Sequence, residues 1–557
     1  MRRNRGVKAP STRLAGPAGA EHDQDRSRSL AMDDTTHRPP DAHPRIAIIG
    51  AGVSGLALGV KLLRAGIGDF DIFEADSRLG GTWWQNQYPG AAVDVHSMLY
   101  QFSFANHHWR RTHGLQHELL EYLENTAKRF GVDQHIRLNT NVESVHWDES
   151  HHQWRVDTAD DEYTYSIVVA ATGFLNDPNL PTWPGLSDFK GVKFHTSQWR
   201  PDTVDVTGKR VAVVGVGSTS VQIVPAIQPL AEQVLVFQRE PGWVLPKGAR
   251  DFSDEEFEKY RSLLRRKLVR WKMAIEAEWQ FVTGPVYVAG NRRNRKAEQA
   301  ARDYINTVFK DRPDLREAVL PNYPFSGKRR VLSDDYYESL LNDNVKLIPR
   351  AVTRVTEAGP VDADGTEYPV DVLVIASGFK ASAYLSRLGV FGTDGKDIQK
   401  VWSDGAFALA GMTVPGFPNF YIMYGPGTNG AGQISVNSLA ENQSTWIIND
   451  IRRMERNGYT AIETRASVTD LYNRWLQKRL ERTAWAKANN YMKGPSGKIV
   501  TQFHGGVTLY WLLLKVLRPL GSFGRRLADH RRPASSPTPA SEPIYLEHAR
   551  QREVLPD

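Results

Sequence analysis

The segment "RIAIIGAGVSGLALGVKLLRAG", Arg45 to Gly66, decides the fold class. Its apolar run Ile46 to Ile49 predicts a buried strand, and Ser54 to Arg64 predicts the helix that follows. The turn between them has the GxGxxG spacing, with glycines at Gly50, Gly52 and Gly55. The first glycine permits a tight turn, the second lets the backbone approach a pyrophosphate, and the third lets the helix pack closely on the strand. We therefore expect an α/β fold with a Rossmann-like, dinucleotide-binding domain.

The next predicted strand supports this interpretation. It lies in "DFDIFEA", Asp69 to Ala75, and ends in Glu74. An acid at this spacing after the glycine turn accepts hydrogen bonds from the hydroxyls of an adenosine ribose. Glu74 is therefore a candidate cofactor ligand.

The same pattern returns in "KRVAVVGVGSTSVQIVPAI", Lys209 to Ile227. The turn contains Gly215 and Gly217, and Ser220 stands where a third glycine would be. Ser218 and Thr219 lie at the expected helix start, where they could donate to a pyrophosphate. After the next strand, Arg239 occupies the place of the acid, and an arginine there suits the 2'-phosphate of NADPH. Opposite ribose preferences predict two different dinucleotide cofactors.

The order of the segments predicts that one nucleotide domain is inserted into the other. "SIVVAATGFLNDPNLP" (Ser166 to Pro181) and "DVLVIASGFKAS" (Asp371 to Ser382) are buried strands that end in small-residue turns, where the chain could cross between domains. The expected boundaries are a disordered extension 1–43, a split domain 44–175 and 370–505, an inserted domain 185–365 with a helical insertion 251–321, a C-terminal helical segment 506–530 and a disordered tail 531–557.

Composition excludes several classes of function. The 557 residues include no cysteine, so disulfides, thiolate metal sites and the redox-active cysteine pair of disulfide reductases are excluded. The net charge of +7 could suggest nucleic acid. However, "YRSLLRRKLVRWK" has helical spacing, with an apolar stripe from Leu263 to Trp271, so its charges are interpreted as a solvated face. We expect neither a nucleic-acid partner nor a metal.

The chain shows no signal peptide and no apolar run long enough to span a bilayer, so we expect a cytoplasmic protein. The run "VTLYWLLLKVL", Val507 to Leu517, is interpreted as a buried helix, with peripheral membrane contact as the alternative.

Three further motifs resemble one enzyme family. "FKGVKFHTSQWRP" matches FxGxxxHxxxW at Phe189, Gly191, His195 and Trp199, although Arg200 follows the tryptophan where Pro or Asp is usual. "GGTWWQNQYPGAAVD" matches GGxWxxxxYPGxxxD in full, ending at Asp94. "NYPFSGKRR", Asn322 to Arg330, is similar to the region that brings a lysine and an arginine to the flavin. Over about residues 44–505 the sequence resembles the Baeyer–Villiger monooxygenases, which are class B flavin-dependent monooxygenases.

The resemblance implies FAD and NADPH as cofactors, and a ketone and O2 as substrates. One oxygen atom would be inserted next to the carbonyl, through a flavin peroxide, to give an ester or lactone. The alternatives are oxygenation of amines or sulfides, and a flavoprotein that oxidises NADPH without oxygenating anything. Neither the natural ketone nor the choice between monomer and homodimer can be inferred.

The resemblance also assigns roles to residues. Arg329 would stabilise the anionic oxygen because a guanidinium stays cationic, and Asp94 would orient it; Arg330 is the competing arginine. Lys328 would bind the 2'-phosphate with Arg239, unless it is a solvated surface charge. His195 is interpreted as a structural residue of a linker between domains, rather than as a base. The remaining cofactor-binding candidates, all in the first half of the chain, are Ser54, Gly81, Thr82, Trp83, Tyr88, Asp94 and Tyr100. The helical insertion could shape the substrate entrance or cap the second domain.

Overall fold

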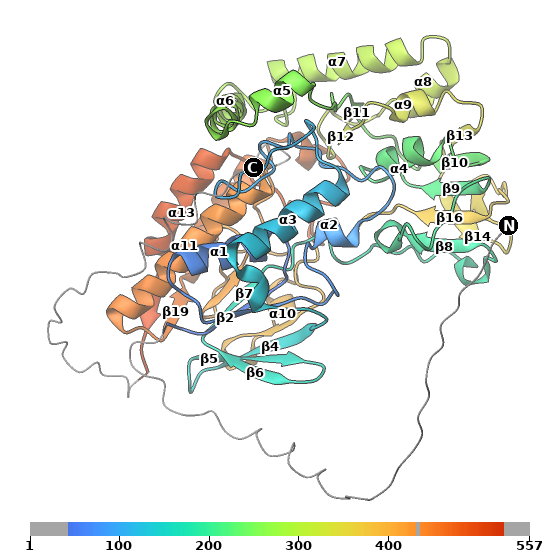
Figure 1. Ribbon diagram of the computed structural model, residues 1–557. Helices are drawn as coiled ribbons and strands as arrows, with labels where there is room; N and C mark the ends of the chain where they lie inside the picture. Colours follow the sequence, from blue (N-terminus) through green and yellow to red (C-terminus); the bar gives the residue numbers. More distant parts are fainter. Residues whose placement is uncertain (1–42, 431–434, 528–557) are drawn as a thin grey trace, which may run out of the picture. The chain divides into compact units, whose positions relative to one another are not determined.

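The computed structural model describes residues 43–430 and 435–527 (Figure 1). The predicted N-terminal extension, apart from its last residue, and the predicted tail 531–557 lie outside the described residues.

The first glycine turn belongs to a five-stranded parallel sheet. Its strand order is β18-β7-β1-β2-β3. The strands are β1 (Ile46–Ile49), β2 (Phe70–Phe73), β3 (Ile136–Arg137), β7 (Ile167–Ala170) and β18 (Phe420–Ile422). β1 and β7 are buried along their whole length, which explains why they are continuous apolar runs rather than alternating ones.

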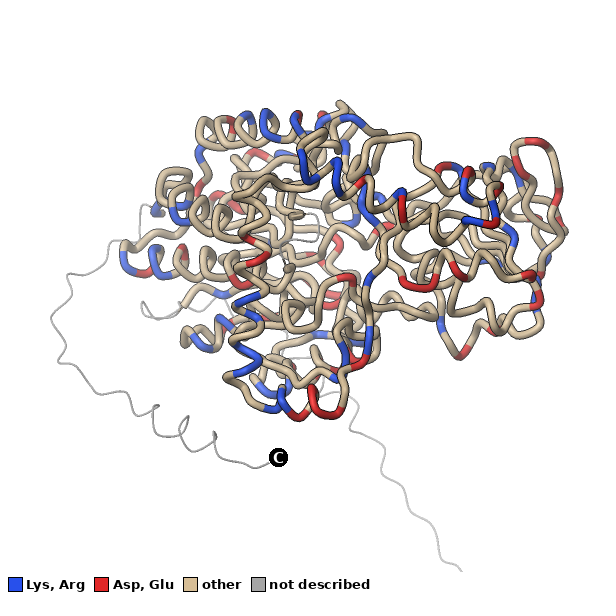
Figure 2. Tube along the Cα trace, turned by 90° about the horizontal axis from the view of Figure 1, so that it is seen from above, with Lys and Arg blue, Asp and Glu red and all other residues tan. Residues whose placement is uncertain are grey.

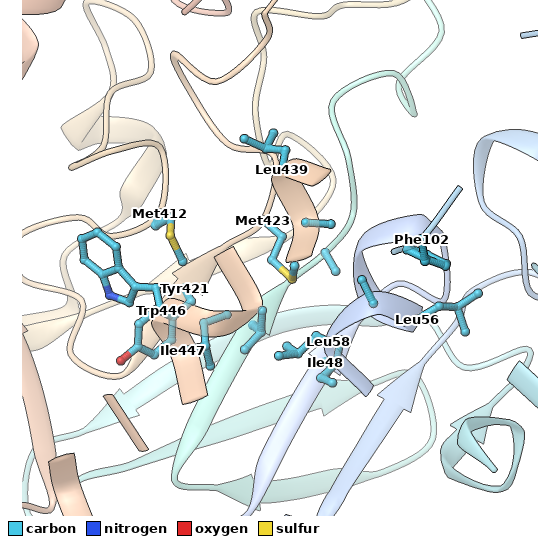
Figure 3. Close-up of a cluster of buried hydrophobic side chains, with 14 of the residues drawn as sticks. Ile48, Leu56, Leu58, Phe102, Met412, Tyr421, Met423, Leu439, Trp446 and Ile447 are labelled. Carbon is cyan, nitrogen blue, oxygen red and sulfur yellow. The ribbon is translucent and has the colours of Figure 1, made fainter. Parts of the chain in front are cut away.

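Three long helices accompany this sheet: α1 (Val53–Arg64), α3 (Gln116–Phe130) and α11 (Val436–Asn457). Figure 3 shows how α1 and α11 meet strand side chains in one cluster, which includes Ile48, Leu56, Met423, Leu439 and Ile447. α1 and α11 are almost 400 residues apart in sequence, so two distant segments of the chain pack together beside this sheet.

A four-stranded sheet completes the first domain and lies at the bottom of Figure 1. Its order is β17-β4-β5-β6, and β4, β5 and β6 are antiparallel neighbours. The strands are β4 (Val142–Asp148), β5 (Gln153–Thr158), β6 (Glu162–Tyr165) and β17 (Gly389–Phe391).

The second glycine turn belongs to a separate parallel sheet, at the right of Figure 1, with the order β13-β10-β9-β16-β8. Its elements are β8 (Val192–His195), β9 (Arg210–Val214), β10 (Gln233–Phe237), β13 (Val345–Ile348), β16 (Val372–Ile375) and helix α4 (Ser220–Ile227). β16 pairs with β9 and β8, so the boundary predicted at 365–370 is wrong. The inserted domain extends through Ile375 because this strand is needed to join the edge strand β8 to the sheet.

The helical insertion consists of α5 (Asp254–Lys259), α6 (Leu263–Val282), α7 (Arg292–Val308) and α8 (Pro313–Val319). It lies along the top of Figure 1. The expectation for α6 is wrong about which face is buried. Leu264, Leu268 and Trp271 are 67%, 58% and 69% exposed, whereas Arg266 is buried.

The C-terminal segment differs from the prediction beyond Gly521. α13 (Val507–Gly521) is a helix with Tyr510 and Leu514 buried and Leu512 and Val516 exposed, so only one face is buried. The next residues form β20 (Ser522–Arg525), which pairs antiparallel with β19 (Ala461–Thr464). Within the described ranges, no helix is both long and apolar enough to cross a membrane.

The remaining helices and strands are short connections, apart from α12. They are α2 (Thr82–Gln85), α9 (Tyr336–Ser339), α10 (Ile398–Val401), α12 (Ala466–Leu480), β11 (Val244–Leu245), β12 (Val331–Leu332), β14 (Val352–Val355) and β15 (Pro360–Asp362). Figure 2 shows that Lys and Arg are interspersed with Asp and Glu over the traced chain.

Candidate active site

A cleft of about 1240 Å³ is lined by residues of both glycine turns. Pockets for one ligand usually measure about 300–1,000 Å³, so this cleft has room for more than one. It collects every cofactor-binding candidate of the sequence except Gly55 and Ser220, and also Arg329. Both domains therefore contribute residues to the cleft.

The first glycine turn is packed so closely that its first and third glycines cannot be replaced without strain. Gly50 has a φ of +108°, and a Cβ there would lie 2.8 Å from the carbonyl oxygen of Ala171. A Cβ on Gly55 would lie 2.0 Å from the carbonyl oxygen of Gly50, so the third glycine lets α1 pack on the turn. Gly55 thus acts by packing and does not itself line the cleft, whereas Gly52, Ser54, Gly81 and Thr82 do.

Glu74 is buried at the end of the second strand and faces the cleft. Its Oε2 accepts the amide hydrogen of Ala51 at 2.7 Å, and its Oε1 accepts that of Asp76 at 3.0 Å. Burial raises the pKa of Glu74, and the two backbone hydrogen bonds act against this rise. Each carboxylate oxygen has a further lone pair, which a ribose hydroxyl can use.

Aromatic side chains form the cleft wall after Gly81. The indole N–H of Trp83 donates to the hydroxyl of Tyr100 at 3.0 Å, and both residues line the cleft. The hydroxyl of Tyr88 instead donates to Oε1 of Gln222 on α4 at 3.1 Å, and burial raises its pKa to about 12. Tyr88 therefore ties the first domain to the second, a contact that the sequence does not indicate.

The second turn leaves open space for a ligand. Gly215 has a φ of +118°, and a Cβ would lie 2.5 Å from the carbonyl oxygen of Ala376, so packing requires glycine there. At Gly217 a Cβ would meet nothing within 4 Å, which leaves room for a phosphate close to the backbone. Ser218 and Thr219 line the cleft just before α4. Ser220 is fully buried, which suits the packing role of the missing glycine.

The predicted phosphate ligands lie on one side of the cleft. Arg239 follows β10 by two residues, is exposed and lines the cleft with Lys328. The ammonium of Lys328 forms an ion pair with Glu240 and lies 4.9 Å from the ring centroid of Tyr323. Glu240 is a partner that sequence analysis missed, although it directly follows Arg239. The cations and open turn fit a dinucleotide with an additional phosphate.

Arg329 and Asp94 meet although 235 residues separate them. Nη2 of Arg329 donates to Oδ2 of Asp94 at 3.0 Å; Arg329 is 43% exposed in the cleft and Asp94 is 14% exposed. Burial lowers the pKa of Arg329, but the charge of Asp94 and the neighbouring Tyr491 and Tyr424 outweigh this effect and raise the pKa above its ordinary value. The guanidinium is therefore held cationic.

The charge of Arg329 affects the pKa values of two other residues, Arg330 and Tyr491. Burial and the charge of Arg329 lower the pKa of Arg330, which does not line the large cleft. Tyr491 does line it, and burial raises its pKa while the charge of Arg329 and a hydrogen bond from it act against the rise. Tyr491 follows two asparagines in a segment without a recognisable motif, so sequence analysis had no signal for it.

The linker residues lie outside the cleft. Nδ1 of His195 accepts from the amide of Ser197 at 3.2 Å, so Nε2 carries the proton and donates to the carbonyl of Gly378 at 2.9 Å. Burial lowers the pKa of His195, and its hydrogen bond to Gly378 acts against this shift. Trp199 is buried against Phe194 in the core of the second domain. Both residues hold the fold together rather than facing a substrate.

The other linker positions are also structural. Phe189 is buried, and a Cβ on Gly191 would lie 2.4 Å from the carbonyl oxygen of Asp371, because β8 and β16 are adjacent. Arg200, where the motif departs from its usual form, donates to the carbonyl of Gln85 at 3.3 Å. This contact connects the linker to α2 of the first domain.

The two glycine turns and the arginine–aspartate pair line one cleft, and the comparisons with known proteins identify the class of enzyme. The model of the "flavin-binding monooxygenase-like" family matches residues 43–267. A Baeyer–Villiger monooxygenase of Pseudomonas aeruginosa is 36% identical and covers 86% of this chain and 91% of its own length. One of Streptomyces coelicolor is 38% identical, over 81% of this chain and 86% of its own length.

Solved structures agree with these relatives. The closed crystal structure of cyclohexanone monooxygenase has a TM-score of 0.78 and 27% identity, covering 87% of this chain and 100% of its own. OTEMO in complex with FAD and NADP has a TM-score of 0.79 and 27% identity, with coverages of 86% and 99%. The chain belongs to the Baeyer–Villiger monooxygenase family. The predicted fold class, the cofactors FAD and NADP, and the NADPH-dependent oxygen insertion are thereby confirmed.

Proposed function

We propose that this enzyme converts a small ketone into an ester or lactone, with Arg329 and Asp94 as its central catalytic pair. In the overall reaction, ketone, O2, NADPH and a proton give ester, NADP⁺ and water. One oxygen atom of O2 enters the product beside the carbonyl carbon, and the other leaves as water. The flavin, when bound and reduced by NADPH, supplies the activated oxygen for this insertion.

The observation that carries the proposal is the position of Arg329. Its guanidinium lies in the cleft shared by both nucleotide turns, fixed by Asp94 at 3.0 Å. Negative charge develops on oxygen as the carbonyl is attacked, and a fixed cation that donates hydrogen bonds stabilises it without giving up a proton. Asp94 acts as the positioning carboxylate, and Tyr491 and Tyr424 line the cleft with Arg329.

The cofactors would be held by the residues at the two turns. Glu74 would accept the ribose hydroxyls of FAD, and the turn at Gly52 would admit its pyrophosphate. Arg239 and Lys328 would bind the 2'-phosphate of NADPH, with Lys328 shared between the phosphate and Glu240. Ser218 and Thr219 would donate to the pyrophosphate of NADPH at the start of α4. We assign residues 44–175 and 376–505 to FAD and residues 185–375 to NADP.

The test is product analysis under heavy-isotope O2 with linear, cyclic and aryl ketones. An ester or lactone with one labelled oxygen supports the proposal. Formation of sulfoxides or N-oxides alone, with no ester from any ketone, would refute it. We also propose a cytoplasmic enzyme that is a monomer or homodimer, and light scattering of the purified protein decides the assembly.

A further inference from the structure

A second, smaller cavity of about 130 Å³ adjoins Arg329. Asp94, Arg329 and Tyr491 line both this cavity and the large cleft, so they form a common wall. A carbonyl group placed at Arg329 would therefore have this cavity available for the rest of its molecule. The volume corresponds to roughly four waters, at about 30 Å³ each, so only a short chain or a single small ring would fit.

Besides Oδ1 of Asp94, three buried polar atoms distinguish this cavity from an ordinary apolar pocket. They are the hydroxyl of Tyr287, the hydroxyl of Ser326 and Oε1 of Gln502, in residues that are 1%, 2% and 1% exposed. None of the three atoms has a hydrogen-bond partner in the described part of the chain. Because unpaired buried polar groups are unfavourable, three of them around one cavity indicate a polar ligand group.

The hydrogen-bonding types of these atoms define that ligand group. Nε2 of Gln502 donates to the hydroxyl of Thr501 at 3.2 Å, which leaves Oε1 as a pure acceptor. The hydroxyls of Tyr287 and Ser326 can donate. A ligand group that both donates and accepts satisfies the set, and an alcohol hydroxyl is the smallest such group.

Lys328 and Arg330 also line this cavity, and the rest of its wall includes aromatic and apolar side chains. Tyr287 stacks on Trp485 with ring centroids 4.4 Å apart, and its carbonyl accepts the amide hydrogen of Ala484 at 2.8 Å. Leu332 and Met492 add apolar surface. Tyr287 lies in the connection between α6 and α7, so the helical insertion contributes directly to this cavity as well as packing on the second domain.

We propose that this cavity makes the enzyme selective for compact hydroxyketones. The carbonyl of the substrate lies at Arg329, its hydroxyl accepts from Tyr287 and Ser326, and the same hydroxyl donates to Oε1 of Gln502. This inference rests on the proposed ketone oxidation and adds the substrate class. A ketone with a methyl group in place of the hydroxyl leaves all three polar atoms unpaired.

The test compares a hydroxyl-bearing cyclohexanone with its methyl-bearing isostere. The wild-type holoenzyme should show a kcat/KM about tenfold or more higher for the hydroxyl compound, because sites built to bind a hydroxyl reject analogues that lack it. Tyr287→Phe should remove most of this preference, measured as the ratio of kcat/KM for the two ketones. The matched control is Tyr472→Phe, since Tyr472 is also buried with an unpartnered hydroxyl but lines neither cavity.

A binding measurement separates this inference from the proposed function. Calorimetric titration of the oxidised, FAD-loaded enzyme without NADPH should give tighter binding of the hydroxyl compound, and Tyr287→Phe should weaken it. If both ketones are oxygenated and bound equally well, the hydroxyketone inference is wrong while ketone oxidation stands. If the hydroxyl compound binds selectively but no ketone yields an ester, the proposed reaction is wrong and the cavity assignment stands. A preference unaffected by Tyr287→Phe overturns the assignment.

Discussion

Replacing Arg329 by methionine tests the centre of the proposed site. Methionine keeps much of the length of the side chain but removes the charge and every N–H donor. Asp94 and Tyr491 engage part of the guanidinium, and the 43% exposure of Arg329 shows that the rest faces the open cleft. Those remaining donors are the ones available to the developing oxyanion.

The expected loss follows from this geometry. Removing one donor group from an oxyanion site costs about 2.7–4 kcal/mol of transition-state stabilisation, or roughly 10²–10³ in kcat. Folding should suffer less: Asp94 keeps some contact with solvent, so its unpaired carboxylate should cost about 1–3 kcal/mol of unfolding free energy. The substitution should therefore greatly lower the rate of ester formation while lowering the free energy of unfolding only modestly.

The assay measures ester by chromatography and NADPH oxidation by absorbance in the same reaction, with thermal unfolding as the folding control. Arg330→Met is the matched variant, since Arg330 is adjacent in sequence and lines the smaller cavity but not the large cleft. Arg329→Met should lose at least about a hundredfold in ester formation, and Arg330→Met should lose much less. The assignment fails if Arg329→Met retains ester formation close to wild type, or if Arg330→Met shows the larger loss.

The remaining predictions concern the cofactor turns and pH. Glu74→Gln should weaken FAD binding roughly tenfold or more, because hydrogen bonds to a charged group contribute about 1.5–3 kcal/mol; titration of the apoenzyme checks this, and unchanged affinity contradicts it. Arg239→Ala should raise KM for NADPH about tenfold and leave KM for NADH unchanged; equal effects on both would remove Arg239 from the 2'-phosphate site. Gly217→Ala should fold normally and bind NADP more weakly, whereas Gly215→Ala should lower Tm because its Cβ meets the backbone. Burial, with the nearby Lys247, lowers the pKa of His113 to about 4. Its contribution to stability is present above the unfolded pKa of about 6.5 and is lost as pH falls toward the folded value, so Tm should drop over this window and drop less in His113→Asn.

Local motifs predicted the two glycine turns because the backbone itself demands glycine there. Positive φ at Gly50 and Gly215, and a close approach at Gly55, can be met by glycine alone, so these requirements are visible as residue types at fixed spacing. Glu74 follows from the same βαβ unit, since chain length fixes its distance from the turn.

Local motifs do not predict which face of a helix packs against the rest of the protein, or which sheet a strand joins. The periodicity of α6 identifies a helix, but not the side that meets the protein, and its apolar stripe is exposed while Arg266 is buried. The predicted domain boundary lies too early in the sequence, because the residues of a buried strand such as β16 do not indicate which sheet the strand joins.

The sequence by itself determined the fold class and the two dinucleotide cofactors, because each depends on short segments with strict geometry. It indicated the reaction type only through the resemblance of its motifs to one enzyme family. The tertiary structure alone decided how those segments meet: Arg329 on Asp94, Lys328 on Glu240, and Tyr287 with Gln502 around a small polar cavity. The reason is physical. Contacts between residues hundreds of positions apart depend on how whole domains pack. The spacing of residues within a short segment does not determine that packing.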